Sequence, residues 1–541
     1  MRVLLLYPLF PKSFWSFERA INLVGKKAFL PPLGLITVAA ILPQEWEFRL
    51  VDRNVGDIRE DDWNWADLVI LSGMIVQAPD LIKQVKAAKA RGKKVAVGGP
   101  YVTSTPQECQ AAGADYLILD EGEITLPMFV EALERGDQSG VFRATEKPNV
   151  TDTPVPRYDL LDMDAYAVMS VQFSRGCPFQ CEFCDIIVLY GRKPRTKTPQ
   201  QLLAELEYLF ELGWRSTIFM VDDNFIGNKR NVKRLLAELH PWMIEKGYPF
   251  TFNTEASVDL AADQELIDAM VACNFGAVFI GIETPDEDSL EVTKKFQNTR
   301  DPLLDSIYKI QSSGIRVMAG FIIGFDGEKQ GAGDRIVQFA EDAAIPLTFF
   351  SMLQALPDTA LAIRLKKEGR LLGTGGDVNQ TTLLNFIPTR PIEDIAREYV
   401  DGFWKLYDPQ NFLDRTYRCY RILGQANFPK KEKKAKKPLN WHLFKAIVIL
   451  FTRQGIIRKT RWTFWFYLFQ LIRHNPGGVM SFLNICAQGE HFLEYRQLVK
   501  ENIESQLATY LAQEYQLKVA TSGSAQETEP VVRSLSGVEK S

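Results

Sequence analysis

Three cysteines lie close together about one third of the way along the 541-residue chain, in the segment Cys177-Pro-Phe-Gln-Cys181-Glu-Phe-Cys184. Thiolates are the usual protein ligands of iron–sulfur clusters. In a [4Fe-4S] cluster, three cysteines would leave one iron without a protein ligand, and a chelating molecule could bind there and receive an electron. The alternative is a zinc site, which needs four tetrahedral ligands. No fourth Cys or His lies nearby, and the next histidine is His240. The spacing therefore favours an iron–sulfur cluster.

The rest of the composition excludes several classes of protein. The other four cysteines are scattered and do not form a disulfide framework. A formal net charge of -4 argues against nucleic acid as the main partner. The N-terminal apolar run is interrupted by Pro8 and Pro11, so it indicates a buried strand and not a signal peptide. No apolar stretch reaches the roughly 20 residues of a membrane-spanning helix, and we expect a cytoplasmic protein.

The chain up to about Leu126 alternates continuous apolar runs with helical patterns. This alternation predicts parallel βαβ units and a doubly wound sheet, in which five strands can be counted. Ligands of such sheets bind beyond the carboxyl ends of the strands. Those ends carry Tyr7-Pro8, Asp52, Ser72-Gly73-Met74, Gly98-Gly99-Pro100 and Glu121-Gly122-Glu123.

A second α/β block follows, with expected strands at 168–173, 216–221, 248–253, 277–282, 316–324 and 347–352. Six βα units suit an open, partial barrel with its active site at the C-terminal mouth. The cysteines directly follow the first of these strands. We expect an α/β protein with these segments: a Rossmann-type domain at 1–147, a linker at 148–164, the partial barrel at 165–354, a helical region at 355–519 and a disordered tail at 520–541.

The pattern C-x3-C-x2-C after a strand resembles the radical S-adenosylmethionine (SAM) superfamily. The resemblance implies that the open iron binds SAM and that reductive cleavage yields a 5'-deoxyadenosyl radical. It places Phe183 near the adenine, although simple packing would also explain this residue. It assigns Asp222-Asp223-Asn224 to the SAM amino group. A Gly-Gly-Glu is commoner at that strand end, and a helix N-cap is the other interpretation of the two carboxylates.

Later strand ends extend the same resemblance. Glu255 and Glu283 could accept hydrogen bonds from the ribose or the ammonium of SAM, or they could form surface salt bridges. Gly320, Ile322 and Gly324 match the family's adenine-contacting G-x-I-x-G pattern, in which glycine allows close backbone approach.

A doubly wound domain before the barrel resembles the cobalamin-binding class of this superfamily. The resemblance assigns the corrin and its nucleotide tail to Ser72, Gly73, Met74, Gly98, Gly99, Thr103 and Glu121. The Asp-x-His-x-x-Gly motif of many cobalamin domains is missing, and no histidine precedes His240. We therefore expect cobalamin without a histidine ligand from this domain. The alternative is a cofactor-free, flavodoxin-like docking domain.

The C-terminal third is similar to the accessory region of a subgroup that includes hopanoid C-2 methylases and bacteriochlorophyll C-8 and C-12 methyltransferases. This implies methylation of an unactivated carbon of a hydrophobic, isoprenoid- or tetrapyrrole-like substrate, with an electron donor such as flavodoxin or ferredoxin. Two alternatives stay open: a cyclase or oxidoreductase that uses both cofactors without methyl transfer, and a non-catalytic corrin or iron–sulfur sensor.

An aromatic and basic stretch runs from Trp441 to Arg473, just after a lysine-rich run at 430–437. Such a composition suits the headgroup boundary of a membrane, where a hydrophobic substrate could be drawn from the bilayer. The other interpretation is that these aromatic residues pack on the barrel. Peripheral membrane association is thus an expectation that depends on where these side chains lie.

Overall fold

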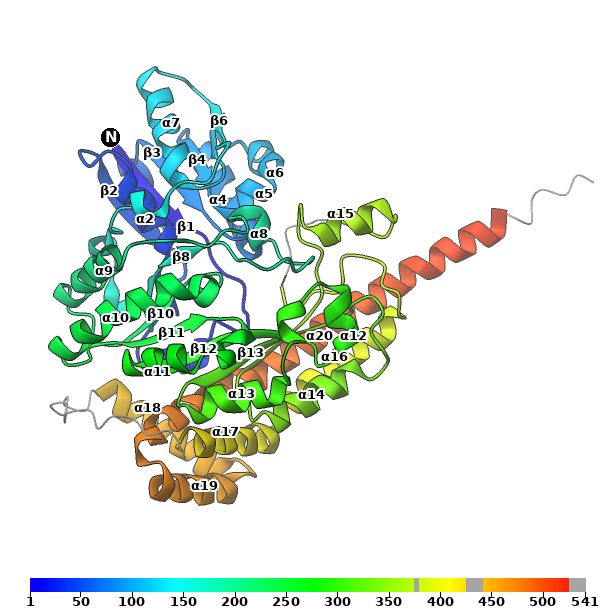
Figure 1. Cartoon of the computed structure of the whole chain (residues 1–541). Coiled ribbons are helices and arrows are strands. Elements are labelled where there is room, and N and C mark those ends of the chain that lie inside the picture. The colour runs from blue at the N-terminus through cyan, green and yellow to red at the C-terminus, as the bar shows by residue number, and fades with distance from the viewer. Residues whose placement is uncertain (374–378, 425–440, 525–541) are drawn as a thin grey trace, which may run out of the picture.

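The computed structural model describes residues 1–373, 379–424 and 441–524, and it contains two six-stranded parallel sheets followed by helices (Figure 1). In Figure 1 the N-terminal sheet lies above the second sheet, and helices of the C-terminal region pack below it. The architecture confirms the expected α/β class, with a doubly wound domain, a radical SAM type sheet and a helical C-terminal region.

The first sheet has the strand order β2-β1-β3-β4-β5-β6. Its strands are β1 (Arg2–Tyr7), β2 (Glu47–Asp52), β3 (Leu68–Ser72), β4 (Lys94–Gly98), β5 (Tyr116–Ile118) and β6 (Gly140–Phe142). The five strands expected up to about Leu126 are β1 to β5, and β6, which lies beyond that segment, adds a sixth strand to the sheet. Strand β6 has only three residues, and its central Val141 is exposed, so the sequence contains no continuous apolar run that would predict this strand.

Helices cover both faces of this sheet, because successive strand residues point to opposite sides. Leu4 and Leu6 belong to one core, and Val3 and Leu5 belong to the other. Helices α3 (Glu60–Trp65), α4 (Ala78–Ala90), α5 (Pro100–Ser104) and α6 (Pro106–Ala111) pack in the first core; α2 (Leu33–Ile41) and α7 (Gly122–Glu134) pack in the second.

The second sheet has the order β14-β13-β12-β11-β10-β7, in which strands adjacent in the sheet follow one another along the chain, and the barrel is open within the described residues. The strands are β7 (Met169–Val171), β10 (Thr217–Met220), β11 (Thr251–Glu255), β12 (Phe275–Glu283), β13 (Arg316–Ile323) and β14 (Thr348–Met352). The expected strand at 248–253 begins later, because Tyr248 has a positive φ of 53° and belongs to a turn.

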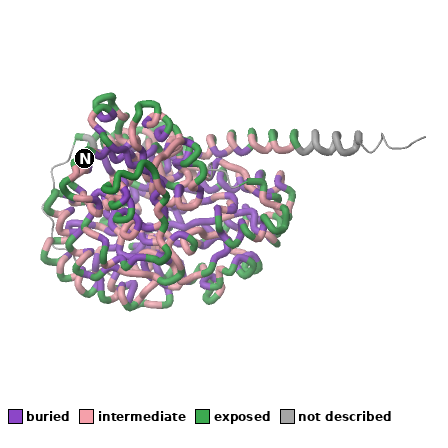
Figure 2. Tube along the Cα trace, turned by 90° about the horizontal axis from the view of Figure 1, so that it is seen from above, coloured by how far each residue is buried: buried purple, intermediate pink, exposed green. Residues whose placement is uncertain are grey.

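Figure 2 shows buried segments inside the molecule and exposed segments around it. Along β10, β11 and β14 of the second sheet, buried residues alternate with partly exposed ones. Phe219, Glu255, Phe279 and Phe349 are partly exposed, while their strand neighbours are buried. The buried face packs against helices, so the partly exposed face is the interior of the open barrel. The helices around this sheet are α8 (Ile186–Leu189), α9 (Pro199–Glu211), α10 (Lys229–Glu245), α11 (Gln264–Ala272), α12 (Glu287–Val292), α13 (Leu303–Ser312) and α14 (Ala332–Asp342).

The segment between the sheets contains three single helical turns, η2 (Val150–Asp152), η3 (Tyr158–Leu160) and η4 (Met163–Ala165). The C-terminal region contains α15 (Ala360–Lys367), α16 (Ile392–Leu406), α17 (Pro409–Leu423), α18 (Trp441–Thr452), the π-helical turn η8 (Arg453–Ile457), α19 (Arg461–His474) and α20 (Val479–Ser524). Helix α20 continues past the expected start of the tail at 520. The lysine run at 430–437 and residues 525–541 lie outside the described residues.

Candidate functional site

The three clustered cysteines lie on the loop between β8 (Ser174–Arg175) and α8, beyond the carboxyl end of β7. Cys181 is buried, whereas Cys177 and Cys184 are partly exposed. All seven cysteines are free thiols, and Cys109, Cys273, Cys419 and Cys486 are buried. The structure therefore brings only the triad to the mouth of the barrel.

Polar groups from other segments surround these thiols. The Gln297 amide donates to Cys181 Sγ at 3.8 Å. Burial raises the pKa of Cys177, partly opposed by the backbone N–H of Phe179 and, to a smaller extent, the Asn224 side chain. Burial alone would lower the pKa of Lys295, but Glu283 and then the nearby Cys181 raise it, so the ammonium stays charged beside the thiols. Hydrogen bonds from amide groups and the positive charge of a buried ammonium stabilise sulfur ligands in their anionic form.

The arrangement distinguishes a cluster from a zinc site. Among the described residues, no three or more His, Cys, Asp or Glu side chains converge closely enough to hold one metal ion. A structural zinc needs four ligands on a single ion, whereas cluster thiolates bind separate irons and stand further apart. The donor set, three thiols that among the described residues do not share one metal ion with a histidine or carboxylate, fits a [4Fe-4S] cluster.

Asp222 and Asp223 hold the segment that leads into the cysteine loop. Asp222 accepts from the backbone N–H of Phe173 at 2.8 Å and from the Ser174 hydroxyl at 2.7 Å. Asp223 accepts from the Gly176 N–H at 2.7 Å. Burial raises the pKa of Asp222 to about 7 and that of Asp223 to about 6. Both carboxylates position the loop in this structure, and contact with the SAM amino group stays a prediction.

Gly176 is required at the start of the loop. Its φ is 93°, in the left-handed region that other residues rarely adopt. A Cβ atom there would lie 2.9 Å from the Gly191 carbonyl and 3.0 Å from the Lys193 carbonyl. The close approach of these two backbone segments therefore sets the direction in which Cys177 leaves β8.

Asn224 and Glu255 lie at neighbouring strand ends. The Asn224 amide donates to the Ser257 hydroxyl at 3.1 Å. The Glu255 carboxylate makes no hydrogen bond or ion pair with any other described residue, although its backbone pairs within β11. Burial first, and then repulsion by Asp223 and Asp222, raise the pKa of Glu255 to about 8. A carboxyl group in this position is suited to receive a cation.

Glu283, by contrast, already has a partner. The Lys295 ammonium donates to Glu283 Oε1 at 2.6 Å, and both side chains are largely buried. This excludes a surface salt bridge. Lys295 Nζ also lies 5.9 Å from the Phe183 ring, which packs against Phe325. Glu283 and Phe183 thus belong to the layer beside the cysteine loop.

The glycines of the expected adenine-contacting strand are accounted for by packing. A Cβ on Gly320 would lie 2.9 Å from the Phe279 ring. Gly324 has a φ of 103°, and a Cβ there would lie 2.9 Å from Leu384. Ile322 is partly exposed on the same strand. Contact of these three positions with adenine stays a prediction.

In the first sheet, the expected cobalamin loops lie together at one edge. The chain order reverses between β1 and β3, and in doubly wound sheets ligands bind at such a switch point. Ser72 pairs with Gly98 in register, and a Cβ on Gly99 would lie 2.4 Å from Ser72 Oγ. A Cβ on Gly73 would lie 3.0 Å from Leu81, while Met74 is half exposed.

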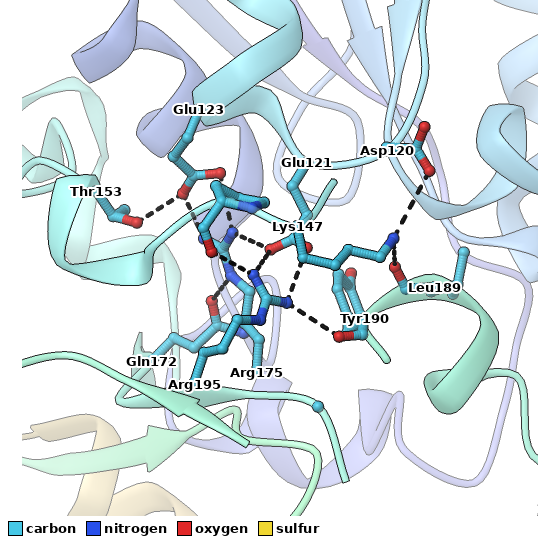
Figure 3. A network of polar contacts seen from close by, with 12 residues as sticks. Asp120, Glu121, Glu123, Lys147, Thr153, Gln172, Arg175, Leu189, Tyr190 and Arg195 are labelled. Atoms are coloured by element: carbon cyan, nitrogen blue, oxygen red, sulfur yellow. Dashed lines mark hydrogen bonds and ion pairs between the residues drawn. The ribbon is translucent and has the colours of Figure 1, made fainter. Parts of the chain in front are cut away.

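Thr103 and Glu121 connect this edge to the rest of the molecule. The Thr103 hydroxyl accepts from the Asp120 N–H at 2.9 Å. Figure 3 shows Glu121 between two guanidinium groups: Arg175 donates to it at 2.8 Å, and Arg195 donates to it at 2.8 Å and 3.0 Å. The Glu121 carboxylate is therefore used in contacts between the two sheets, and binding of a cofactor by it stays a prediction.

Several residues of this site do not belong to any motif that can be recognised in the sequence. Arg175 also donates to Glu123 at 2.8 Å and 2.9 Å, which links the residue two positions before Cys177 to the first domain (Figure 3). Arg364 pairs with Glu182 inside the cysteine motif at 2.8 Å. Lys295 and Gln297 come from the loop after α12. Arginine at 175 and glutamate at 123 lie far apart along the chain, so only the fold reveals these contacts.

Replacing Glu255 by Gln should make the stability of the cluster-free chain less dependent on pH. Because the pKa of Glu255 is about 8 in the folded chain and 4.5 otherwise, the folded state binds the proton more tightly. Its stabilising contribution is complete below about pH 4.5 and is lost as the pH rises through about 8. We expect the variant to be more stable at pH 9 by on the order of 2 kcal/mol, allowing for partial solvent screening.

Thermal unfolding between pH 5 and 9 measures this effect. Glu265→Gln is the matched control, because Glu265 is largely exposed. Parallel pH profiles for the Glu255→Gln chain and the unmodified chain would show that Glu255 is ionised throughout.

Comparison with known proteins places these features in a family. Three family models match: "B12 binding domain" at residues 23–130, "Radical SAM superfamily" at 171–340 and "Domain of unknown function (DUF4070)" at 359–505. An uncharacterized methyltransferase of Synechocystis sp. is 64% identical over 99% of this chain and 100% of its own. The hopanoid C-2 methylase of Rhodopseudomonas palustris is 34% identical over 91% of this chain and 93% of its own.

The fold is also that of a solved cobalamin-dependent enzyme. The structure of the cobalamin-dependent SAM radical enzyme OxsB, with aqua-cobalamin and SAM bound, superposes with a TM-score of 0.57 at 15% identity and covers 94% of this chain and 81% of that chain. Together with the cysteine loop and the two facing strand edges, these relationships imply a [4Fe-4S] cluster, SAM and cobalamin as cofactors. The chain belongs to the cobalamin-dependent radical SAM methyltransferases, the family that includes hopanoid C-2 methylase.

Proposed function

We propose that this chain methylates an unactivated carbon of a hydrophobic, isoprenoid- or tetrapyrrole-like substrate. When bound, the cluster with SAM supplies a 5'-deoxyadenosyl radical, and cobalamin supplies the methyl group. The observation that carries the proposal is the pairing of Arg175 with Glu121 and Glu123 at 2.8 Å. It joins the cysteine loop to the carboxyl edge of the first sheet, so the two cofactor regions face each other.

The residues of the chain have distinct roles in this proposal. Cys177, Cys181 and Cys184 hold the cluster, and the partnerless Glu255 accepts the SAM ammonium. Asp222 positions the cysteine loop through Phe173 and Ser174. For cobalt, we propose no histidine ligand: His240 lies within 3.3 Å of the Tyr248 hydroxyl, and His491 lies 3.0 Å from the Ser13 carbonyl.

Aromatic side chains support a hydrophobic substrate. Phe279 and Phe349 are partly exposed on the interior face of the open barrel. Trp15, from the N-terminal segment, stacks on Phe349 with ring centroids 5.7 Å apart and meets Phe279 edge-on at 5.6 Å. Such rings offer large apolar contact surfaces with defined orientation. The relative from R. palustris is likewise named for a polycyclic isoprenoid substrate, a hopanoid.

We further propose that the chain works in the cytoplasm at a membrane surface and receives electrons from a flavodoxin or ferredoxin. Hydrophobic substrates of this class reside in bilayers, and the enzyme must reach them there. Within the described part of the chain, no helix is both long and apolar enough to span a bilayer. Contact with the membrane would therefore have to be made by a surface.

The test is an anaerobic reaction of the cobalamin-loaded protein with SAM labelled in its methyl group, reduced flavodoxin and a lipid extract containing isoprenoids and tetrapyrroles. We expect the label in a lipid product together with 5'-deoxyadenosine, and neither with Cys184→Ala. Paramagnetic resonance of the Co(II) form should lack nitrogen splitting from an axial ligand. An unlabelled, cyclised or oxidised product would indicate the cyclase or oxidoreductase. Absence of 5'-deoxyadenosine would indicate a sensor.

A further inference from the structure

Helix α19 is apolar on two opposite faces, and only one of them is covered. Phe464, Leu468 and Leu471 are buried at the spacing of one helical face. Trp462, Phe466 and Phe469 repeat at the same spacing on the other side and are exposed, with Trp462 73% and Phe469 67% accessible. A helix that is apolar all round is normally buried on every side. The outer face of α19 therefore lacks the partner that its composition requires.

The neighbouring elements also expose apolar side chains. Trp441, Phe444 and Val448 are exposed at i, i+3 and i+7 on α18. Ile456 and Ile457 are exposed on η8, which contacts both α18 and α19. These side chains and the exposed side chains of α19 are called here the apolar face. So many exposed large apolar side chains on adjoining elements indicate an interaction site.

The segment that carries the apolar face contains cations but no acidic residue, since no Asp or Glu occurs between Glu432 and Glu490. Arg453 and Arg458 pair with Glu490. Within the described residues, the other four cations of these elements have no ion-pair partner; they are Lys445, Lys459, Arg461 and Arg473. A protein partner with an apolar core would not require this excess of positive charge, whereas an anionic lipid surface would.

We propose that the apolar face inserts into the headgroup boundary of an anionic phospholipid bilayer. Tryptophan and phenylalanine enter the interface while the unpaired cations meet lipid phosphates. This inference rests on the proposed function only in that a bilayer would present the hydrophobic substrate. The binding itself needs neither SAM nor substrate.

Vesicle co-sedimentation of the full chain tests the proposal without any methyl-transfer readout. Vesicles of phosphatidylcholine alone are compared with vesicles that also contain phosphatidylglycerol. We expect binding to the second kind, weakened by salt because charge attraction is screened. Phe466→Ser with Phe469→Ser should lower the partition coefficient at least tenfold, and Lys459→Gln with Arg461→Gln should lower it about tenfold.

Matched variants at other exposed positions should bind like the unmodified chain. These are Ile244→Ser on α10, where the side chain is 56% exposed, and Lys366→Gln with Lys367→Gln on α15. Equal sedimentation with both kinds of vesicle, or equal binding of all variants, would overturn the proposal. A dimer would also overturn it. Light scattering would then show a concentration-dependent dimer that the double variant Phe466→Ser with Phe469→Ser abolishes, and the chain would not bind vesicles. In that case the apolar face would join two copies of the chain. Retained methyl transfer to detergent-dispersed substrate would separate this failure from failure of the proposed function.

Discussion

Replacing Cys177, Cys181 or Cys184 singly by Ala abolishes reductive SAM cleavage. Each variant leaves only two thiols at the barrel mouth, and the structure offers no replacement, because no other cysteine of the described chain lies outside a buried core. With two ligands the cluster cannot present its open iron in a fixed position. Formation of 5'-deoxyadenosine by the reduced, reconstituted protein measures the loss, which we expect to exceed 100-fold, a conservative lower bound for removal of an essential ligand.

The control variants are Cys273→Ala and Cys419→Ala. Both side chains are fully buried in the hydrophobic core, so they do not reach the mouth of the barrel where the triad lies. These variants should keep the cluster absorbance and the cleavage rate. Loss of absorbance in either control, with absorbance kept in a triad variant, would refute the ligand assignment.

Replacing Arg175 by Met should destabilise the folded chain by roughly 3–5 kcal/mol, the usual cost of leaving buried charge uncompensated. Arg175 is 12% exposed and pairs with Glu121 and Glu123, which are almost fully buried. In the variant, Glu121 keeps only Arg195, and Glu123 keeps only the Thr153 hydroxyl. The unfolding free energy of the cluster-free chain, from its first denaturation transition, provides the measurement.

Arg2→Met is the matched control for this effect. Arg2 and Asp67 also form a pair at 2.7 Å, but both side chains are nearly half exposed. Exposed pairs contribute less than about 1 kcal/mol. A similar loss of stability in both variants would mean that the contacts between the two sheets are no stronger than surface pairs. In that case they would not hold the cysteine loop against the first domain.

Local sequence patterns determined most of the architecture. Several strands of the first sheet, such as β1 and β3, are continuous apolar runs, because residues buried on both faces of a parallel sheet are apolar. In the second sheet, β10, β11 and β14 instead alternate between buried and partly exposed residues. The cysteine loop was evident because its ligands lie within eight consecutive residues. Strand β6 was not predicted, because three residues with an exposed central side chain carry no periodic signal.

Tertiary structure alone decided the contacts between distant segments. Glu121 and Glu283 lie at strand ends, and only the fold shows that they pair with Arg175 and Lys295. Only the fold likewise shows that Phe279 and Leu384 pack beside Gly320 and Gly324, whose contact with adenine stays a prediction. The aromatic residues of α19 could have been core or surface, because a helix that is apolar all round has no periodicity to show which face is covered. Only packing against the rest of the chain determines that Phe464 is buried and Trp462 is exposed.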